Sequence, residues 1–249
     1  MDIIVCMKRV PDSAARIQIG GDGRSIDSAG LEHIISPYDE MALERALQIK
    51  EEQGGTVTVV CLGAAEAAKE IRQALAMGAD QALHIKSDVG YRDPLTTARI
   101  LADHLKGRTF DMLLFGKQSI DADNSAIGVM VATLLDLPAV SLVTKLDAAD
   151  GKATVEREAE AGAEVIEVAL PAVFTAQRGL AEPRYPSIKG IMQAKKKPIE
   201  EAQAPEEAAL ITLEALEPPP ARTGGRIVGE GVEAVPELVR LLRSEAKVL

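Results

Sequence analysis

The stretch VTVVCLGAAEAAKEIRQALAMG, residues 57–78, contains the pattern that decides the fold. Its first six residues, 57–62, form an apolar run with the length of a buried strand, and Gly63 follows as a turn. A helical pattern comes next and stops at Gly78, a residue type that commonly ends helices. This strand, turn and helix predict one unit of a parallel α/β sheet.

The same alternation of strand and helix patterns continues along the chain. Strands that alternate with helices imply a parallel, doubly wound sheet of the Rossmann-like type, covered on both faces. We expect the parallel pattern to end near residue 140, and an antiparallel addition from 154 to 170. The strands are expected at 3–7, 57–62, 81–85, 111–115 and 172–176, and the helices after Ser36, Gly63, Asp93 and Asn124.

The end of the chain has a different composition. Residues 198–222 are rich in Pro, Glu and Ala, which predicts an extended linker, and residues 235–246 have the apolar stripe of an amphipathic helix. We therefore expect an α/β domain over residues 1–197 and a linker with a C-terminal arm over residues 198–249. An isolated amphipathic helix after a linker usually docks onto another surface.

Composition excludes several classes of function. The 249 residues carry a formal net charge of −10, which disfavours binding to nucleic acid or to an anionic membrane. Cys6 and Cys61 lie in apolar runs, so we expect buried free thiols and a reducing compartment, with the cytoplasm as the simplest location. No signal-peptide pattern, apolar run of 18 residues, metal-ligand spacing or catalytic triad motif is apparent.

Candidate ligand contacts lie just beyond the strands, because ligands of open parallel sheets bind at the carboxyl ends. Cys6, Leu62 and Gly116 stand at such ends, and the helix start at 36–39 can reach the same edge. Its Ser, Pro and acid pattern predicts a capped helix. Residues 116–125 join a strand end to a helix N-terminus, where free N–H groups favour phosphate. Two interpretations stay open there: a nucleotide site, or a capped helix with exposed acids.

A basic segment of this acidic chain is the second candidate site. Three lysines at 195–197 follow a stretch that contains Ile188, Ile191 and Met192. A solvated charge run is one interpretation. The other is a docking surface, on which exposed apolar side chains beside basic residues meet a partner with an acidic rim.

Taken together, these segments closely resemble the beta subunit of electron transfer flavoproteins, nearly end to end. The resemblance is carried by residues 5–10, 74–80, 116–123 and 182–197. It implies a heterodimer with an alpha subunit that holds a redox-active FAD, and one structural AMP in this subunit. It also implies that this subunit has no catalytic residue of its own, and the spacing of the histidines predicts no metal site. Electrons would pass from acyl-CoA dehydrogenase-type flavoenzymes to a membrane quinone oxidoreductase.

The resemblance also implies which residues make the contacts. A loop over residues 177–198 would dock the dehydrogenases, with Ile188 in a partner pocket, and the arm from about Pro218 would wrap the alpha subunit. The nucleotide contacts would be Cys6, Ser36, Pro37, Tyr38, Asp39, Leu62, Gly116, Lys117, Gln118, Ser119, Ile120, Asp121, Ala122, Asp123, Asn124, Ser125, Ala126 and Ile127. The partner-docking residues would be Arg184, Tyr185, Ile188, Ile191 and Met192.

Two other functions remain open. Electron-bifurcating relatives hold a second FAD in the same site, although Asp-Ala-Asp-Asn at residues 121–124 favours the AMP-binding branch over the Asp-Gly-Asp-Thr pattern of the bifurcating one. A stand-alone nucleotide-binding protein or hydrolase of this fold would leave the segment 184–197 without a role. Some members have an aromatic residue near the partner's flavin at the position of Ser13, which is small and polar here.

Overall fold

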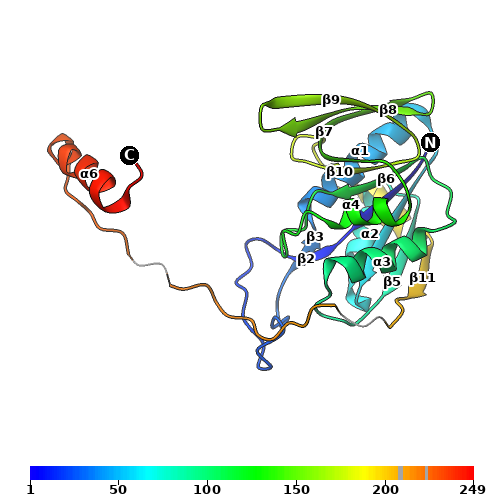
Figure 1. Cartoon of the computed structure of the whole chain (residues 1–249). Coiled ribbons are helices and arrows are strands. Elements are labelled where there is room, and N and C mark those ends of the chain that lie inside the picture. The colour runs from blue at the N-terminus through cyan, green and yellow to red at the C-terminus, as the bar shows by residue number, and fades with distance from the viewer. Residues whose placement is uncertain (207–209, 222–223) are drawn as a thin grey trace. The chain divides into compact units, whose positions relative to one another are not determined.

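The computed structural model describes residues 1–206, 210–221 and 224–249. It divides the chain into two compact units, Met1–Leu216 and Glu217–Leu249, which are described separately below. Figure 1 shows the elements of each unit and labels most of them.

One nine-stranded sheet forms the centre of the first unit, in the order β11-β5-β4-β1-β6-β10-β7-β8-β9. All neighbours from β11 to β7 run parallel, and β8 and β9 add an antiparallel end. This confirms the predicted α/β fold class. The strands are β1 (Asp2–Met7), β4 (Thr56–Gly63), β5 (Gln81–Lys86), β6 (Met112–Gly116), β7 (Ala139–Ala149), β8 (Lys152–Ala159), β9 (Gly162–Ala169), β10 (Ala172–Ala176) and β11 (Ile199–Gln203).

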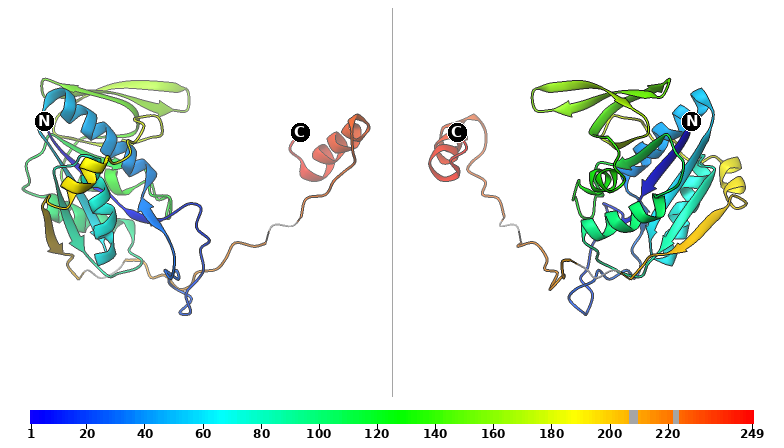
Figure 2. Two further views of the ribbon diagram at one scale, coloured as in Figure 1. Left: turned by 180° about the vertical axis from the view of Figure 1, so that it is seen from behind. Right: turned by 45° about the vertical axis from the view of Figure 1, so that its right-hand side comes forward.

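Helices cover both faces of this sheet, as the two views of Figure 2 show. Alternate residues of β1 enter two separate cores: Val5 packs with side chains of α1 and α2, and Cys6 with those of α3 and α4. Burial on both faces explains why β1 is a continuous apolar run. The helices are α1 (Pro37–Gln53), a 3-10 turn at Ala65–Ala67 that leads into α2 (Ala68–Met77), α3 (Pro94–Leu105), α4 (Ile127–Leu134) and α5 (Ile188–Ala194).

The structure corrects the expected end of the parallel pattern near residue 140. β10 inserts between β6 and β7 and runs parallel to both, so the parallel region includes residues far beyond that point. A separate antiparallel ribbon of β2 (Arg9–Pro11) and β3 (His33–Ile35) was not predicted. Three-residue strands are too short to produce a recognisable alternation of apolar and polar residues.

Part of the expected linker also belongs to the sheet. β11, with the sequence IEEAQ, pairs with β5, although its composition indicates a solvated segment. Further along, Leu210 N donates to Asp93 Oδ2 at 3.1 Å, and Leu216 N donates to Gly23 O at 2.8 Å. The first compact unit includes these residues and extends to Leu216. Residues 207–209 and 222–223 of the expected linker lie outside the described residues.

The second unit contains a 3-10 turn at Val232–Ala234, α6 (Val235–Leu241) and a π-helical turn at Leu242–Ala246. The helix predicted over residues 235–246 is thus present. Leu241 is its buried side chain, whereas Val235 and Leu238 are exposed. Within the described ranges, no helix is both long and apolar enough to span a membrane.

Candidate functional site

The carboxyl ends of β1, β4 and β6 lie side by side, because β1 pairs in parallel with both of the other strands. Cys6 is opposite Val60 of β4, and Leu62 lies just beyond the next pair, Met7 and Cys61. The structure therefore brings together the strand ends that the sequence indicated. Cys6 is buried among residues of the α3 and α4 face, so we expect any ligand contact from it through the main chain.

Asp39, in the first turn of α1, joins these strand ends. Its carboxylate accepts hydrogen bonds from Lys8 N, just after β1, at 2.9 Å and from Gly116 N, at the end of β6, at 2.8 Å. The side chain is buried, and desolvation raises the pKa of Asp39 to about 7 against the lowering effect of these two hydrogen bonds. Asp39 is thus a framework residue of the edge, with both oxygens engaged.

α1 and β6 approach each other closely at Gly116. A Cβ atom there would lie 2.5 Å from Asp39 Oδ1 and 2.6 Å from Tyr38 Cβ, so only glycine fits without movement of the helix. The next residue, Lys117, places its Nζ 5.1 Å from the centre of the Tyr38 ring, a cation–π contact. The helix start at 36–39 and the loop after β6 therefore form one packed group.

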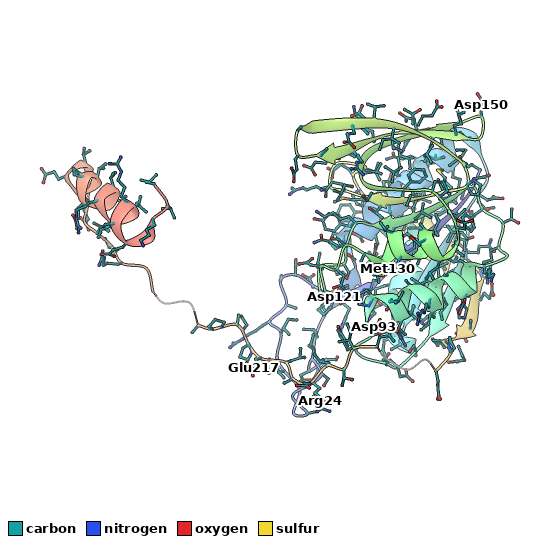
Figure 3. All side chains as sticks on the ribbon, viewed as in Figure 1. Arg24, Asp93, Asp121, Met130, Asp150 and Glu217 are labelled. Carbon is teal, nitrogen blue, oxygen red and sulfur yellow. The ribbon has the colours of Figure 1, made fainter. Side chains whose placement is uncertain are left out.

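The loop from Lys117 to Ala126 is held by its own polar side chains. Gln118 Nε2 donates to Asp123 Oδ1 at 2.5 Å, and Ser125 Oγ donates to Gln118 Oε1 at 2.9 Å. Asp123 and Ser125 have positive φ angles of 49° and 50°, which small polar residues tolerate best. These contacts hold the loop together, and Figure 3 labels Asp121 within it.

Neither helix start at this edge has a side-chain cap. Ala126 occupies the N-cap position of α4. Ser36 occupies that position of α1, but its side chain makes no hydrogen bond to the helix N–H groups. The Ser36 hydroxyl lies 3.5 Å from Gln118 O instead. This corrects the expected capping pattern at 36–39 and the alternative that the loop acids cap α4. The loop acid Asp121 instead accepts from Lys8 Nζ at 2.6 Å.

The first unit has two surface cavities. One, of about 430 Å³, lies in the excursion between β2 and β3, over residues 12–32. The other, of about 420 Å³, lies beyond β5 and is lined by residues 86–89, 91, 92 and 203–206 with Ala65 and Thr96. None of the predicted nucleotide contacts lines either cavity. The described residues also contain no group of three His, Cys, Asp or Glu side chains arranged to hold a metal ion.

The second predicted site is an exposed apolar segment at α5. Tyr185 is 96% exposed and Ile188 is 82% exposed, and Ile191 and Met192 are exposed as well. Arg184 differs from these four residues. Its guanidinium Nε and Nη2 donate to the two carboxylate oxygens of Glu44 in α1, each at 2.8 Å.

The two acids that accept hydrogen bonds from Arg184 were not predicted from the sequence. Glu44 is buried and Glu51 is exposed, and both accept hydrogen bonds from Arg184. Their spacing of seven residues places them on one helix face, which was an available signal. The partner of that face, an arginine 140 residues away from Glu44, had no signal in the sequence.

Comparison with known proteins identifies the family. A model of the electron transfer flavoprotein domain matches residues 24–207. Among curated proteins, the chain is 43% identical to an electron transfer flavoprotein subunit beta of Bacillus subtilis, with 100% of both chains covered. It is 39% identical to one of Syntrophomonas wolfei, covering 100% of this chain and 98% of the other, and 35% identical to the human one, covering 99% and 98%. The chain therefore belongs to the family of electron transfer flavoprotein beta subunits.

Proposed function

We propose that the chain is the smaller subunit of a heterodimeric electron transfer flavoprotein in the cytoplasm. With an alpha subunit, it passes electrons from acyl-CoA dehydrogenase-type flavoenzymes, as in fatty acid oxidation, to a quinone oxidoreductase. FAD held mainly by the alpha subunit supplies the redox chemistry. This chain contributes a structural AMP site and a docking segment, residues 185–192, and no catalytic residue of its own.

The observation that carries the nucleotide part is the convergence of separate segments at one sheet edge. Asp39 and Gly116 pack α1 against the end of β6, and the loop after Gly116 leads to the start of α4. That start has N–H groups without a side-chain acceptor, which suits a phosphate. The polar loop supplies hydroxyl and amide groups for a ribose or base, so the residues present fit an adenine nucleotide.

The nucleotide proposal is tested by composition. The chain is co-expressed with its alpha subunit, the purified complex is denatured, and released FAD and AMP are counted per heterodimer. One FAD and one AMP would support the proposal. Two FAD without AMP would replace it with the electron-bifurcating function, in which this subunit holds a second flavin. A stable monomer with neither partner nor nucleotide would contradict both.

The docking part predicts a large effect of Ile188→Ala. Removing a well-packed apolar side chain from the centre of an interface costs about 2 kcal/mol, so the affinity for an acyl-CoA dehydrogenase should fall roughly 30-fold. Steady-state electron transfer at limiting dehydrogenase and isothermal calorimetry measure this loss. Val165→Ala is the matched control, because Val165 is an exposed apolar residue of β9 outside the docking segment. Equal loss of AMP and affinity would argue against a docking role for Ile188.

A further inference from the structure

Arg184 immediately precedes the exposed docking segment, residues 185–192. Its side chain is directed at α1. Nε and Nη2 donate to Glu44 at 2.8 Å each, Nη2 reaches Glu51 Oε2 at 3.1 Å, and Nη1 also contacts Glu51. Its backbone N–H donates to Glu44 Oε2 at 3.2 Å. Arg184 therefore contacts α1 with both its main chain and its side chain.

The pair with Glu44 is shielded from solvent on one side. The Glu44 side chain is 4% exposed and that of Arg184 is 33% exposed. Gln48 Nε2 also donates to Glu44 Oε1, at 3.0 Å. A two-pronged arginine–carboxylate pair fixes geometry better than a single contact, and removal of one partner leaves a buried charge without its counterion.

The far end of the docking segment is fixed to a different helix. A Cβ atom on Gly190 would lie 2.3 Å from Ala76 O of α2, so the two helices touch at a glycine. Arg72 Nη1 donates to Ala194 O at 2.6 Å and to Lys197 O at 2.8 Å. Lys197 Nζ in turn donates to Leu75 O at 3.0 Å, near the end of α2. Figure 2 shows α5 lying beside α2.

The exposed apolar side chains thus lie between two attachments. Tyr185 and Ile188 follow Arg184 directly, and Ile191 and Met192 lie in α5 before Ala194, which is buried. An exposed apolar side chain gains little stabilisation from burial, so it does not fix its own position. The position of the segment has to be set by contacts of the residues on either side of it. On the amino side of the segment, Arg184 supplies those contacts.

We infer that Arg184 is a positioning residue, which holds the docking segment in one conformation on α1 through Glu44, and not itself a contact of the partner. The inference rests on the proposed docking function and assigns a different role to one of its residues. A partner that meets a segment already in its bound conformation does not have to order it, so apparent affinity rises with the fraction of molecules in that conformation. Loss of the attachment should lower that fraction.

The experiment uses the full heterodimer with Arg184→Gln, Glu44→Gln and Ile188→Ala variants, and an acyl-CoA dehydrogenase as the probe. Amide hydrogen exchange over residues 179–192, dehydrogenase affinity and AMP content are measured for each variant. Arg184→Gln and Glu44→Gln should both speed exchange about tenfold and weaken affinity five- to tenfold, with AMP unchanged. Ile188→Ala should weaken affinity without faster exchange. Arg178→Gln, at an exposed arginine of the same loop, should change neither quantity.

Glu44 makes the experiment decisive, since a buried carboxylate cannot touch the partner. If Arg184→Gln weakens docking while Glu44→Gln leaves docking and exchange unchanged, Arg184 contacts the partner and the inference is wrong. Normal affinity and exchange in Arg184→Gln would also overturn it. Arg184→Lys keeps the charge but not the two-pronged geometry, and it should fall between wild type and Arg184→Gln. If the wild-type complex does not bind the dehydrogenase, the proposed function fails, and the exchange data still decide the role of Arg184.

Discussion

Replacement of Asp39 by Asn is expected to remove a pH dependence from the free energy of unfolding. In the folded chain, burial raises the pKa of Asp39 to about 7 from its ordinary value of 3.8. A folded state with the higher pKa binds a proton that the unfolded state has released. Its stability is therefore fully present below pH 3.8 and is lost as the pH rises toward 7.

The size of the effect follows from this difference in pKa. About three pH units at 1.36 kcal/mol each correspond to about 4 kcal/mol over the whole range. Roughly 2–3 kcal/mol of it falls between pH 5 and pH 8, where denaturation is convenient to measure. Asn has no charge to bury, so the variant should lack this contribution. Its amide has one acceptor oxygen for two N–H donors, Lys8 N and Gly116 N, which should cost about 1–3 kcal/mol at every pH.

The assay is urea unfolding of the full chain and of the Asp39→Asn variant at pH 5, 6, 7 and 8. Taking the difference between the two proteins cancels the other titrating groups. The wild type should lose 2–3 kcal/mol relative to the variant from pH 5 to pH 8. Asp103→Asn, at an exposed acid of α3, is the control and should show no such trend. The reasoning would be refuted if the variant were destabilised, relative to the wild type, more at pH 8 than at pH 5. The two hydrogen bonds to the charged carboxylate would then outweigh the cost of burying its charge.

Two further predictions concern the same edge of the sheet. Gly116→Ala would place a Cβ 2.5 Å from Asp39 Oδ1 and 2.6 Å from Tyr38 Cβ. It should therefore lower the free energy of unfolding in urea by about 1–3 kcal/mol and lower the AMP content of the complex. Unchanged stability and AMP content would show that α1 moves away freely. Lys8→Met should change stability by less than about 1 kcal/mol, because its pair with Asp121 has side chains that are 47% and 27% exposed. A larger loss, or one that persists in 1 M salt, would contradict that view of Lys8.

Much of this architecture could be predicted from sequence because its signals are local. The apolar runs of β1, β4 and β6 are continuous, and the turns and helix starts between them are marked by Gly and Pro. The rule that ligands bind at carboxyl ends then selects one edge. The position of β11 had no such signal, since its pairing with β5 depends on a neighbour far away in sequence.

Polar residues with distant partners were the harder part. Asp39 has the spacing of a capping acid, but its carboxylate binds N–H groups at two strand ends, 31 and 77 residues away. Glu44 belongs to a helix with many charges, and it is buried in contact with Arg184. Helical periodicity identifies which side of a helix is apolar, whereas it does not identify which charged residue a later loop will cover.

The place of β10 between β6 and β7 has a consequence for synthesis of the chain. β6, residues 112–116, has no partner on the side of β10 until residues 172–176 have been synthesised. The centre of the sheet therefore cannot be completed until about 176 residues have left the ribosome. Until then β6 presents an open apolar edge, the kind of surface that chaperones cover and that aggregates otherwise. The docking segment follows β10 within a dozen residues, so it emerges only after the centre of the sheet can be completed.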